Sequence, residues 1–115
     1  MKLAIIGSRE FNDYEFLCKS LEPIKSMVQL VVSGGAKGAD ELGERWANEN
    51  NIPTLIFYAD WKKHGKSAGF IRNIDIIKNC DAVVAYQVNQ SKGTQHSLNL
   101  AKEHSKKIRV FRFTF

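Results

Sequence analysis

Short apolar runs alternate along this chain with longer segments of helical periodicity, and this alternation restricts the fold more than any other feature. Runs that suit buried strands cover residues 2–6, 28–32, 54–58, 81–86 and 107–113. Segments with apolar residues every three or four positions cover residues 13–26, 39–50, 68–79 and 94–105. Such alternation produces a parallel sheet with right-handed crossovers and helices on both faces. The sequence therefore predicts an α/β fold, a single Rossmann-like three-layer domain with a parallel five-stranded sheet over residues 1–115.

Details of this pattern lead to narrower expectations. The strands at residues 2–6, 28–32 and 81–86 have the most apolar character, so we expect them in the interior of the sheet. Pro23 predicts an irregular end to the first helix, and we expect a loop at residues 59–66. The third helix is expected to turn four apolar side chains inward, which are Phe70, Ile71, Ile74 and Ile77.

The charge balance bears on the partner of this domain. The sequence has 17 lysine and arginine residues against 12 acidic residues, and the net charge of +5 favours an anionic partner, a nucleotide or a nucleic acid. Much of the excess lies at residues 62–66 and 102–112, and we interpret the second cluster as a solvated helix and edge strand. Nucleic acid is therefore a partner that the charge allows but that the sequence does not favour.

The sequence gives no sign of a membrane span, a signal peptide or a metal site. No apolar run approaches the ~20 residues that span a bilayer, and the run at residues 2–6 suits a strand better than a signal peptide. We therefore expect a cytoplasmic protein with no membrane partner. The two cysteines and three histidines lie outside any metal-binding spacing, so we expect neither a metal nor a cofactor. The oligomeric state stays open, with a homo-oligomer as one alternative.

A glycine-rich segment at residues 33–40 is the strongest candidate for a ligand-binding loop. It leads directly from a predicted strand into a predicted helix, where free backbone N–H groups and the helix dipole attract anions. Its glycine spacing differs from the G-x-G-x-x-G dinucleotide fingerprint. Asp40 either caps the helix or accepts hydrogen bonds from a ligand hydroxyl. We predict phosphate binding through six residues of this loop, which are Ser33, Gly34, Gly35, Lys37, Gly38 and Asp40.

Two other loops supply candidates, because the carboxyl ends of parallel strands gather at one edge of a sheet. Gly7, Ser8 and Arg9 follow the first strand, where a glycine allows close approach and a guanidinium can grip a phosphate. A tight turn with a surface arginine explains them equally well. Asp60 and Trp61 belong to a loop that forms either a lid with an aromatic platform for a base, or a cover in which Trp61 folds back on the core.

Two helix starts complete the candidate site, and each has a structural alternative. Arg72 and Asn73 lie near the start of the third helix and can face the ligand, although Arg72 can also pair with Asp75. Gly93 precedes the fourth helix and Thr94 begins it, where Thr94 can serve simply as the N-cap.

Five segments then occur in a recognisable order. They read IIGSRxF at 5–11, SGGAKGAD at 33–40, ADW at 59–61, AGFIRN at 68–73 and SKGT at 91–94. Together they resemble the YspA/YpsA-related branch of the SLOG superfamily, which unites DNA-processing protein A and the lonely-guy phosphoribohydrolases. The resemblance implies a Rossmann-like domain with a pocket for nucleotides or nucleotide-sugar derivatives. It would place around that pocket Gly7, Ser8, Arg9, Gly34, Gly35, Gly38, Asp40, Arg72, Asn73, Gly93 and Thr94.

One departure from these relatives bears on function. The lonely-guy enzymes carry GGxGTxxE, whose glutamate serves glycosidic cleavage, and Ser97 occupies that position here. We therefore favour a sensor or binding module for a nucleotide or a nucleotide-derived ligand, ADP-ribose-like or a nucleotide sugar. The alternative is a hydrolase that cleaves an N-glycosidic or phosphate bond in a nucleotide, with Asp40 or Glu44 as the carboxylate. Nucleic-acid binding is less favoured, and no catalytic residue is assigned.

Overall fold

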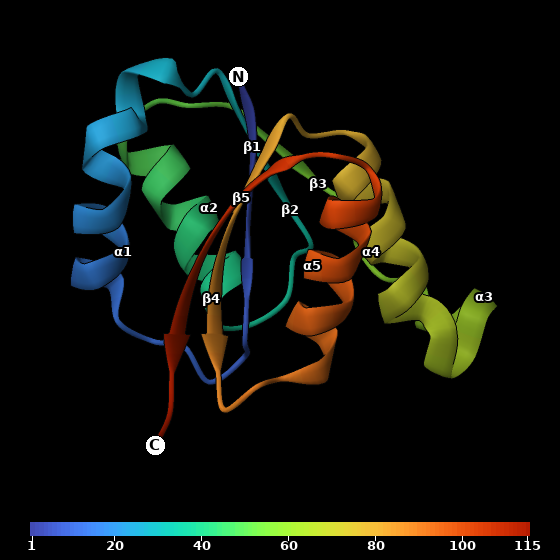
Figure 1. Ribbon diagram of the computed structural model, residues 1–115. Helices are drawn as coiled ribbons and strands as arrows, with labels where there is room; N and C mark the ends of the chain where they lie inside the picture. Colours follow the sequence, from blue (N-terminus) through green and yellow to red (C-terminus); the bar gives the residue numbers. More distant parts are fainter.

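The computed structural model describes all 115 residues as alternating strands and helices (Figure 1). The strands are β1 (Lys2–Gly7), β2 (Leu30–Ser33), β3 (Thr54–Ile56), β4 (Ala82–Val88) and β5 (Lys107–Phe113). The α-helices are α1 (Tyr14–Leu21), α2 (Ala39–Glu49), α3 (Trp61–His64), α4 (Ala68–Lys78) and α5 (Lys92–Glu103). Two 3₁₀ segments are Glu22–Met27 and Gly65–Ser67. None of the helices has the length and apolar character needed to cross a membrane.

All five strands pair in parallel in one sheet with the order β3-β2-β1-β4-β5. This confirms the predicted five-stranded parallel sheet with the first, second and fourth strands in its interior. From β1 the chain builds outward through β2 and β3, and then returns to add β4 and β5 on the other side. The strand order therefore reverses between β1 and β4, which is where open α/β sheets bind ligands.

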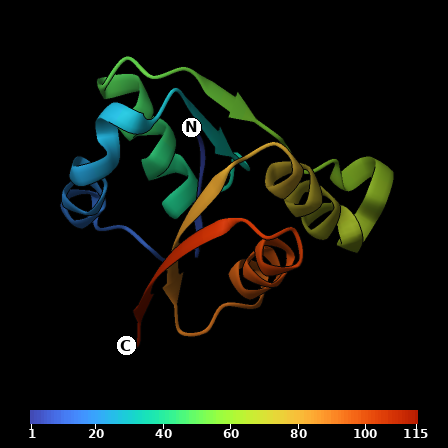
Figure 2. The ribbon, with the colours of Figure 1, turned by 45° about the horizontal axis from the view of Figure 1, so that its top comes forward.

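Helices cover both faces of the sheet, so the domain has three layers (Figure 2). Leu3 and Ile5 of β1 point into one core, which contains buried side chains of α1 and α2. Ala4 and Ile6 point into the other core, which contains buried side chains of α4 and α5. This strict alternation along β1 follows from the two-residue period of a strand buried on both faces.

The boundaries of three elements differ from the sequence-based prediction. The first α-helix ends at Leu21 and continues as a 3₁₀ segment, because Pro23 has no N–H to donate. The predicted loop at residues 59–66 contains the short helix α3, and the Asp60 carboxylate caps it by accepting the Lys63 N–H at 3.1 Å. The last helix begins at Lys92 with Ser91 at the N-cap position, so the prediction that Thr94 begins it was wrong.

The predicted inward face of α4 was also partly wrong. Ile77 is buried, but Phe70 and Ile71 are 47% and 36% exposed. Asn73 is buried in their place, and its amide nitrogen lies 3.3 Å from His96 Nδ1. Because a buried amide can be satisfied by partners from a neighbouring helix, an apolar pattern alone could not give the rotation of α4.

Candidate functional site

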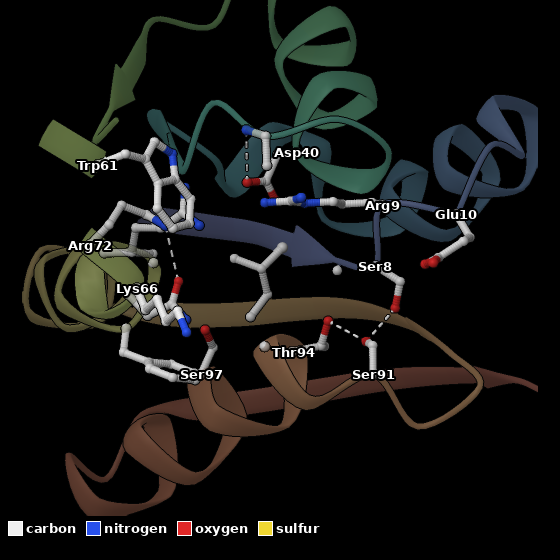
Figure 3. Close-up of a pocket in the computed structure, with 18 residues that line it drawn as sticks. Ser8, Arg9, Glu10, Asp40, Trp61, Lys66, Arg72, Ser91, Thr94 and Ser97 are labelled. Carbon is white, nitrogen blue, oxygen red and sulfur yellow. Dashed lines mark hydrogen bonds between the residues drawn. The ribbon is translucent and has the colours of Figure 1, made fainter. Parts of the chain in front are cut away.

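A cavity of about 340 Å³ opens at the carboxyl edge of the sheet, beside the point where the strand order reverses (Figure 3). We call it the main cavity. Of the residues predicted from the sequence, it is lined by Gly7, Ser8, Arg9, Asp40, Trp61, Arg72, Asn73, Gly93 and Thr94. It is also lined by residues not predicted, which are Ile6, Glu10, Ala36, Lys66, Gly69, Phe70, Ile76, Ser91 and Ser97. The loop after β1 and the first turns of α2, α4 and α5 therefore converge on one space.

A second pocket of about 450 Å³ adjoins the main cavity, and we call it the side pocket. It contains three further predicted residues, Gly34, Gly35 and Lys37, together with Tyr58 and Ala59. The two cavities share four lining residues, which are Arg9, Ala36, Trp61 and Arg72. The glycine-rich loop thus faces the side pocket more than the main cavity.

Three predicted residues line neither cavity and have structural contacts instead. The Ser33 hydroxyl donates a hydrogen bond to Glu44 Oε2 at 2.6 Å, and Asp60 caps α3. Gly38 has a φ of +81° and lies against the backbone of the loop after β1. Its successor Ala39 donates its N–H to the Ser8 carbonyl at 3.2 Å, which ties the two loops together.

Arg72 reaches across from α4 to the glycine-rich loop. Its Nη1 donates to the Gly34 carbonyl at 2.5 Å, and its Nε donates to Asn73 Oδ1 at 3.1 Å. The surface pairing with Asp75 is not formed, since the ion pairs of the protein lie elsewhere, on α1, α2 and the first 3₁₀ segment. The guanidinium is therefore held at the boundary between the two cavities.

Arg9 supplies a second guanidinium from the loop after β1, and its side chain extends toward Asp40 in Figure 3. Burial lowers the pKa of Arg72, the nearby Asp40 carboxyl group opposes this effect, and the positive charge of Arg9 lowers the pKa further. Two like charges thus face the same space, and neither belongs to an ion pair. An anion between them would relieve this repulsion.

Asp40 is a carboxyl group at the wall of the main cavity, only 6% exposed. Burial raises its pKa to about 7, against the opposing effects of the Arg72 charge and of the Ala36 N–H, which Asp40 Oδ2 accepts at 3.3 Å. Asp40 does not occupy the N-cap position of α2, which is Gly38. Near neutral pH it is therefore divided between its protonated and ionised forms, and it can donate a hydrogen bond to a ligand or accept one.

Three hydroxyl groups form a chain with a defined direction along the opposite wall (Figure 3). The Val88 N–H donates to Ser8 Oγ at 2.8 Å, Ser8 Oγ lies 2.5 Å from Ser91 Oγ, and Ser91 Oγ donates to Thr94 Oγ1 at 2.9 Å. Because the Ser91 proton is used on Thr94, Ser8 is the donor to Ser91. The hydroxyl proton of Thr94 is left free for an acceptor in the cavity.

Some residues that line the main cavity were not predicted, although the sequence around them pointed to the site. Ser91 belongs to the SKGT segment, and Glu10 directly follows Arg9. Ser97 lies one helical turn after Thr94, on the same side of α5, and is 4% exposed. The sequence could not predict that Phe70 lines the cavity, because its position depends on the rotation of α4.

No group of three histidine, cysteine or acidic side chains gathers in a way that could hold a metal ion, and both cysteines are free thiols.

Comparison with known proteins decides the family. The model of the YspA, cpYpsA-related SLOG family matches residues 1–64. The Gene 61 protein of Mycobacterium phage D29 is 35% identical over 111 residues, which cover 89% of this chain and 89% of that protein. The chain belongs to the YspA, cpYpsA-related SLOG family.

This SLOG chain also has the fold of two larger solved proteins. DNA processing protein A from Streptococcus pneumoniae is 20% identical with a TM-score of 0.80, covering 95% of this chain and 49% of that one. DNA processing protein A from Helicobacter pylori is 22% identical with a TM-score of 0.73, covering 96% of this chain and 64% of that one. The latter protein is described as binding single-stranded DNA. The SLOG chain thus corresponds to about half to two thirds of these structures.

Proposed function

We propose that this SLOG chain is a sensor or binding module that holds a phosphate-bearing nucleotide, or a ligand derived from one, in the main cavity. The observation that carries the proposal is the pair of guanidinium groups, Arg9 and Arg72, that face one cavity and form no salt bridge. Guanidinium groups bind phosphate through charge-assisted and often bidentate hydrogen bonds. The volume of about 340 Å³ lies within the usual range of small-molecule sites, ~300–1,000 Å³.

Other groups in the main cavity fit the remaining parts of a nucleotide. The first turn of α5, with Gly93 and Thr94, adds unpaired backbone N–H groups and the positive end of a helix dipole for the phosphate. Asp40 suits a ribose hydroxyl, since it can act as donor or acceptor near pH 7. Trp61 is 53% exposed at the wall, so it does not fold back on the core and its ring is accessible to a base.

Calorimetric titration with AMP tests this proposal. Arg9→Ala removes a guanidinium that has no structural hydrogen bond, and a lost charge-assisted bond of ~1.5–3 kcal/mol should weaken AMP binding about tenfold to a hundredfold. Arg72→Lys should have a similar effect, because lysine keeps the charge and loses the fork geometry. Arg109→Ala, at an exposed residue of the edge strand β5, is the matched control and should bind AMP normally. Affinity for AMP that is unaffected by both cavity variants would contradict the proposal.

We further predict that the SLOG chain lacks phosphoribohydrolase activity. Glycosidic cleavage develops positive charge on the sugar, and general acid and base groups typically accelerate such steps ~10²–10⁴-fold. Ser97 lines the cavity, and it stands at the sequence position of the glutamate in the GGxGTxxE motif. A serine hydroxyl supplies no negative charge there. Chromatography of AMP incubated with the protein should show no free adenine. Release of adenine that is lost in Asp40→Asn or Glu10→Gln, the two carboxyl groups lining the cavity, would overturn this prediction.

Single-stranded nucleic acid is a second candidate ligand, and one surface feature favours it. Tyr58, Trp61 and Phe70 are 71%, 53% and 47% exposed around the two cavities. Lys62, Lys63 and Lys66 are exposed nearby on α3 and the 3₁₀ segment that follows it. Exposed aromatic rings beside basic residues are the usual means of binding single strands. The description of the Helicobacter pylori relative as binding single-stranded DNA gives this candidate more weight than the sequence alone did.

Fluorescence anisotropy with a labelled oligothymidylate distinguishes the two candidates. If the protein binds single strands, the logarithm of the association constant should fall linearly with the logarithm of salt concentration, as phosphate contacts release counterions. Lys62 and Lys63 changed together to alanine should then reduce that slope while leaving AMP affinity unchanged. An oligonucleotide that binds no more tightly than AMP excludes this candidate.

A further inference from the structure

A chain of hydrogen bonds connects Arg72, at the boundary of the two cavities, with His96 on α5. The Arg72 Nε donates to Asn73 Oδ1 at 3.1 Å, and Asn73 Nδ2 lies 3.3 Å from His96 Nδ1. Asn73 is 8% exposed, so its amide has little access to water as an alternative partner. His96 lines neither cavity, and the Phe70 ring packs against it with the ring centroids 4.5 Å apart. His96 therefore acts on the site through its neighbours, and the hydrogen-bonded route runs through Asn73 to Arg72.

The direction of each hydrogen bond in this chain is determined by Arg72. A guanidinium group has donors and no acceptor, so the oxygen of the Asn73 amide must face Arg72. The amide nitrogen then faces His96, and because an NH₂ group only donates, His96 Nδ1 must accept. The imidazole of His96 is therefore neutral in this arrangement, with its proton on Nε2.

A proton on His96 Nδ1 is incompatible with this arrangement. The Nδ1–H of a charged imidazole and the NH₂ of Asn73 would oppose each other as two donors. If the amide turned round to accept from His96, its NH₂ would oppose the Arg72 Nε–H instead. In the first case Asn73 loses the contact that orients it. In the second case Arg72 loses one of its two hydrogen bonds and keeps only that to the Gly34 carbonyl. Either way the guanidinium is held less firmly.

No carboxylate stabilises a proton on His96. The ion pairs of the protein lie on other residues. Asp75, the acidic residue of α4, is exposed on the opposite side of that helix from Asn73, and Glu103 lies about two turns further along α5. The remaining charged groups of α4, α5 and the 3₁₀ segment before α4 are cations, which are Lys66, Arg72, Lys78, Lys92 and Lys102. A proton on His96 would thus add charge to a region that is already positive.

We propose that His96 is a positioning residue for the phosphate site, which fixes Arg72 through Asn73 while it is neutral and loosens Arg72 when it takes up a proton. The site would then bind its anion more tightly in mild alkali than in mild acid. Histidine commonly changes its charge between about pH 5 and 8, so this range covers the change. Because His96 lines neither cavity, its charge would not contact the ligand, and the loss of a fixed Arg72 decides the sign. This inference rests on the proposed binding of a phosphate by Arg72.

Calorimetric titration with AMP at about pH 8 and about pH 5.5 compares the wild type with His96 variants. His96→Asn stays neutral and keeps an acceptor oxygen near the position of Nδ1, whereas His96→Leu has no acceptor. His104→Asn, at the exposed C-cap of α5, is the matched control. At about pH 8 we expect His96→Asn and His104→Asn to bind AMP like the wild type, and His96→Leu to bind about threefold to tenfold more weakly.

The comparison at about pH 5.5 tests the effect of the proton. The wild type should bind AMP about threefold to tenfold more weakly than His96→Asn, and still equally to His104→Asn. Ratios between proteins at one pH are compared because AMP and Asp40 also titrate in this range in every variant. A ratio of wild type to His96→Asn that is the same at both pH values would overturn the effect of the proton. His96→Leu that binds like the wild type at about pH 8 would overturn the positioning role.

NMR of the side chains tests the hydrogen-bond chain without any ligand. Long-range proton–nitrogen correlations at about pH 8 should show the His96 proton on Nε2 and none on Nδ1. At about pH 5.5 the Arg72 Nε–H should exchange with water faster in the wild type than in His96→Asn. A proton on Nδ1 at about pH 8, or equal exchange in the two proteins, would overturn the inference. AMP that fails to bind the wild type at either pH would refute the proposed function, and these measurements would then decide the positioning of Arg72 alone.

Discussion

Asp40→Asn should make the protein more stable at about pH 8 and leave its stability nearly unchanged at about pH 4. The side chain is 6% exposed, and burial raises the pKa of its carboxyl group from 3.8 to about 7. Asparagine has the same shape and can still accept the Ala36 N–H, but it never carries the buried charge. The substitution therefore removes the cost of ionising this group inside the protein.

The direction of this pH dependence follows from the raised pKa. Between about pH 4 and pH 7 the folded protein keeps a proton on Asp40 that the unfolded chain has lost. The resulting stabilisation is complete below the unfolded pKa and disappears as the pH rises through about 7. The full difference corresponds to ~4 kcal/mol, at 1.36 kcal/mol for each pKa unit.

Urea unfolding of both proteins across this pH range measures the effect. The free energies of unfolding should separate progressively from about pH 4 to pH 8, with the variant higher. Asp81→Asn is a control that should not gain stability as the pH rises. The Lys2 N–H lowers the pKa of that exposed carboxyl group, so its ionised form supports the folded state. An Asp40→Asn variant that is less stable than the wild type at pH 8 would show that the charge of Asp40 supports the fold.

Gly38→Ala should cause a large loss of stability. A Cβ there would lie 2.3 Å from the Ser8 carbonyl oxygen and 2.6 Å from that of Arg9, and Gly38 has a φ of +81°. Both carbonyl oxygens belong to the backbone, so the added Cβ can be accommodated only if the loops after β1 and β2 move apart. That movement would break the hydrogen bond from Ala39 N–H to the Ser8 carbonyl.

Thermal unfolding gives the size of this effect. Backbone strain of ~1–3 kcal/mol plus the lost loop contact should lower the free energy of unfolding by about 3 kcal/mol and Tm by roughly 10 °C or more. Gly93→Ala is the matched control, because no atom lies within 4 Å of its added Cβ and its φ is not positive. It should change stability by less than about 1 kcal/mol, in the stabilising direction. Equal Tm values for Gly38→Ala and wild type would contradict the close approach of the two loops.

Sequence reasoning was reliable where backbone and burial periodicities determine the structure. The alternation of short apolar runs with helical segments along the chain predicted the three-layer parallel sheet. The structure agrees, since residues 2–6 alternate between two apolar cores. The position of the candidate site followed from the same rule, since the loop after β1 and the glycine-rich loop had to emerge at one edge.

What the sequence could not provide depends on contacts between distant segments. Arg72 was assigned either to the ligand or to Asp75, and it instead anchors the Gly34 carbonyl while facing both cavities. The side pocket depends on Tyr58 packing against Gly35, a contact between two loops that no spacing encodes. The raised pKa of Asp40 likewise arises from burial, which cannot be read from a carboxyl group at a helix start.

Binding of a nucleotide phosphate between Arg9 and Arg72 is the central claim, and an NMR titration with AMP tests it most directly. Amide resonances of nitrogen-15-labelled protein should shift and saturate at Gly34, Gly93 and Thr94 around the cavities. Those of Met27 and Asn51, which precede β2 and β3 at the amino edge of the sheet, should stay in place. Resonances around the main cavity that do not move at millimolar AMP, or shifts centred on the amino edge, would contradict the account.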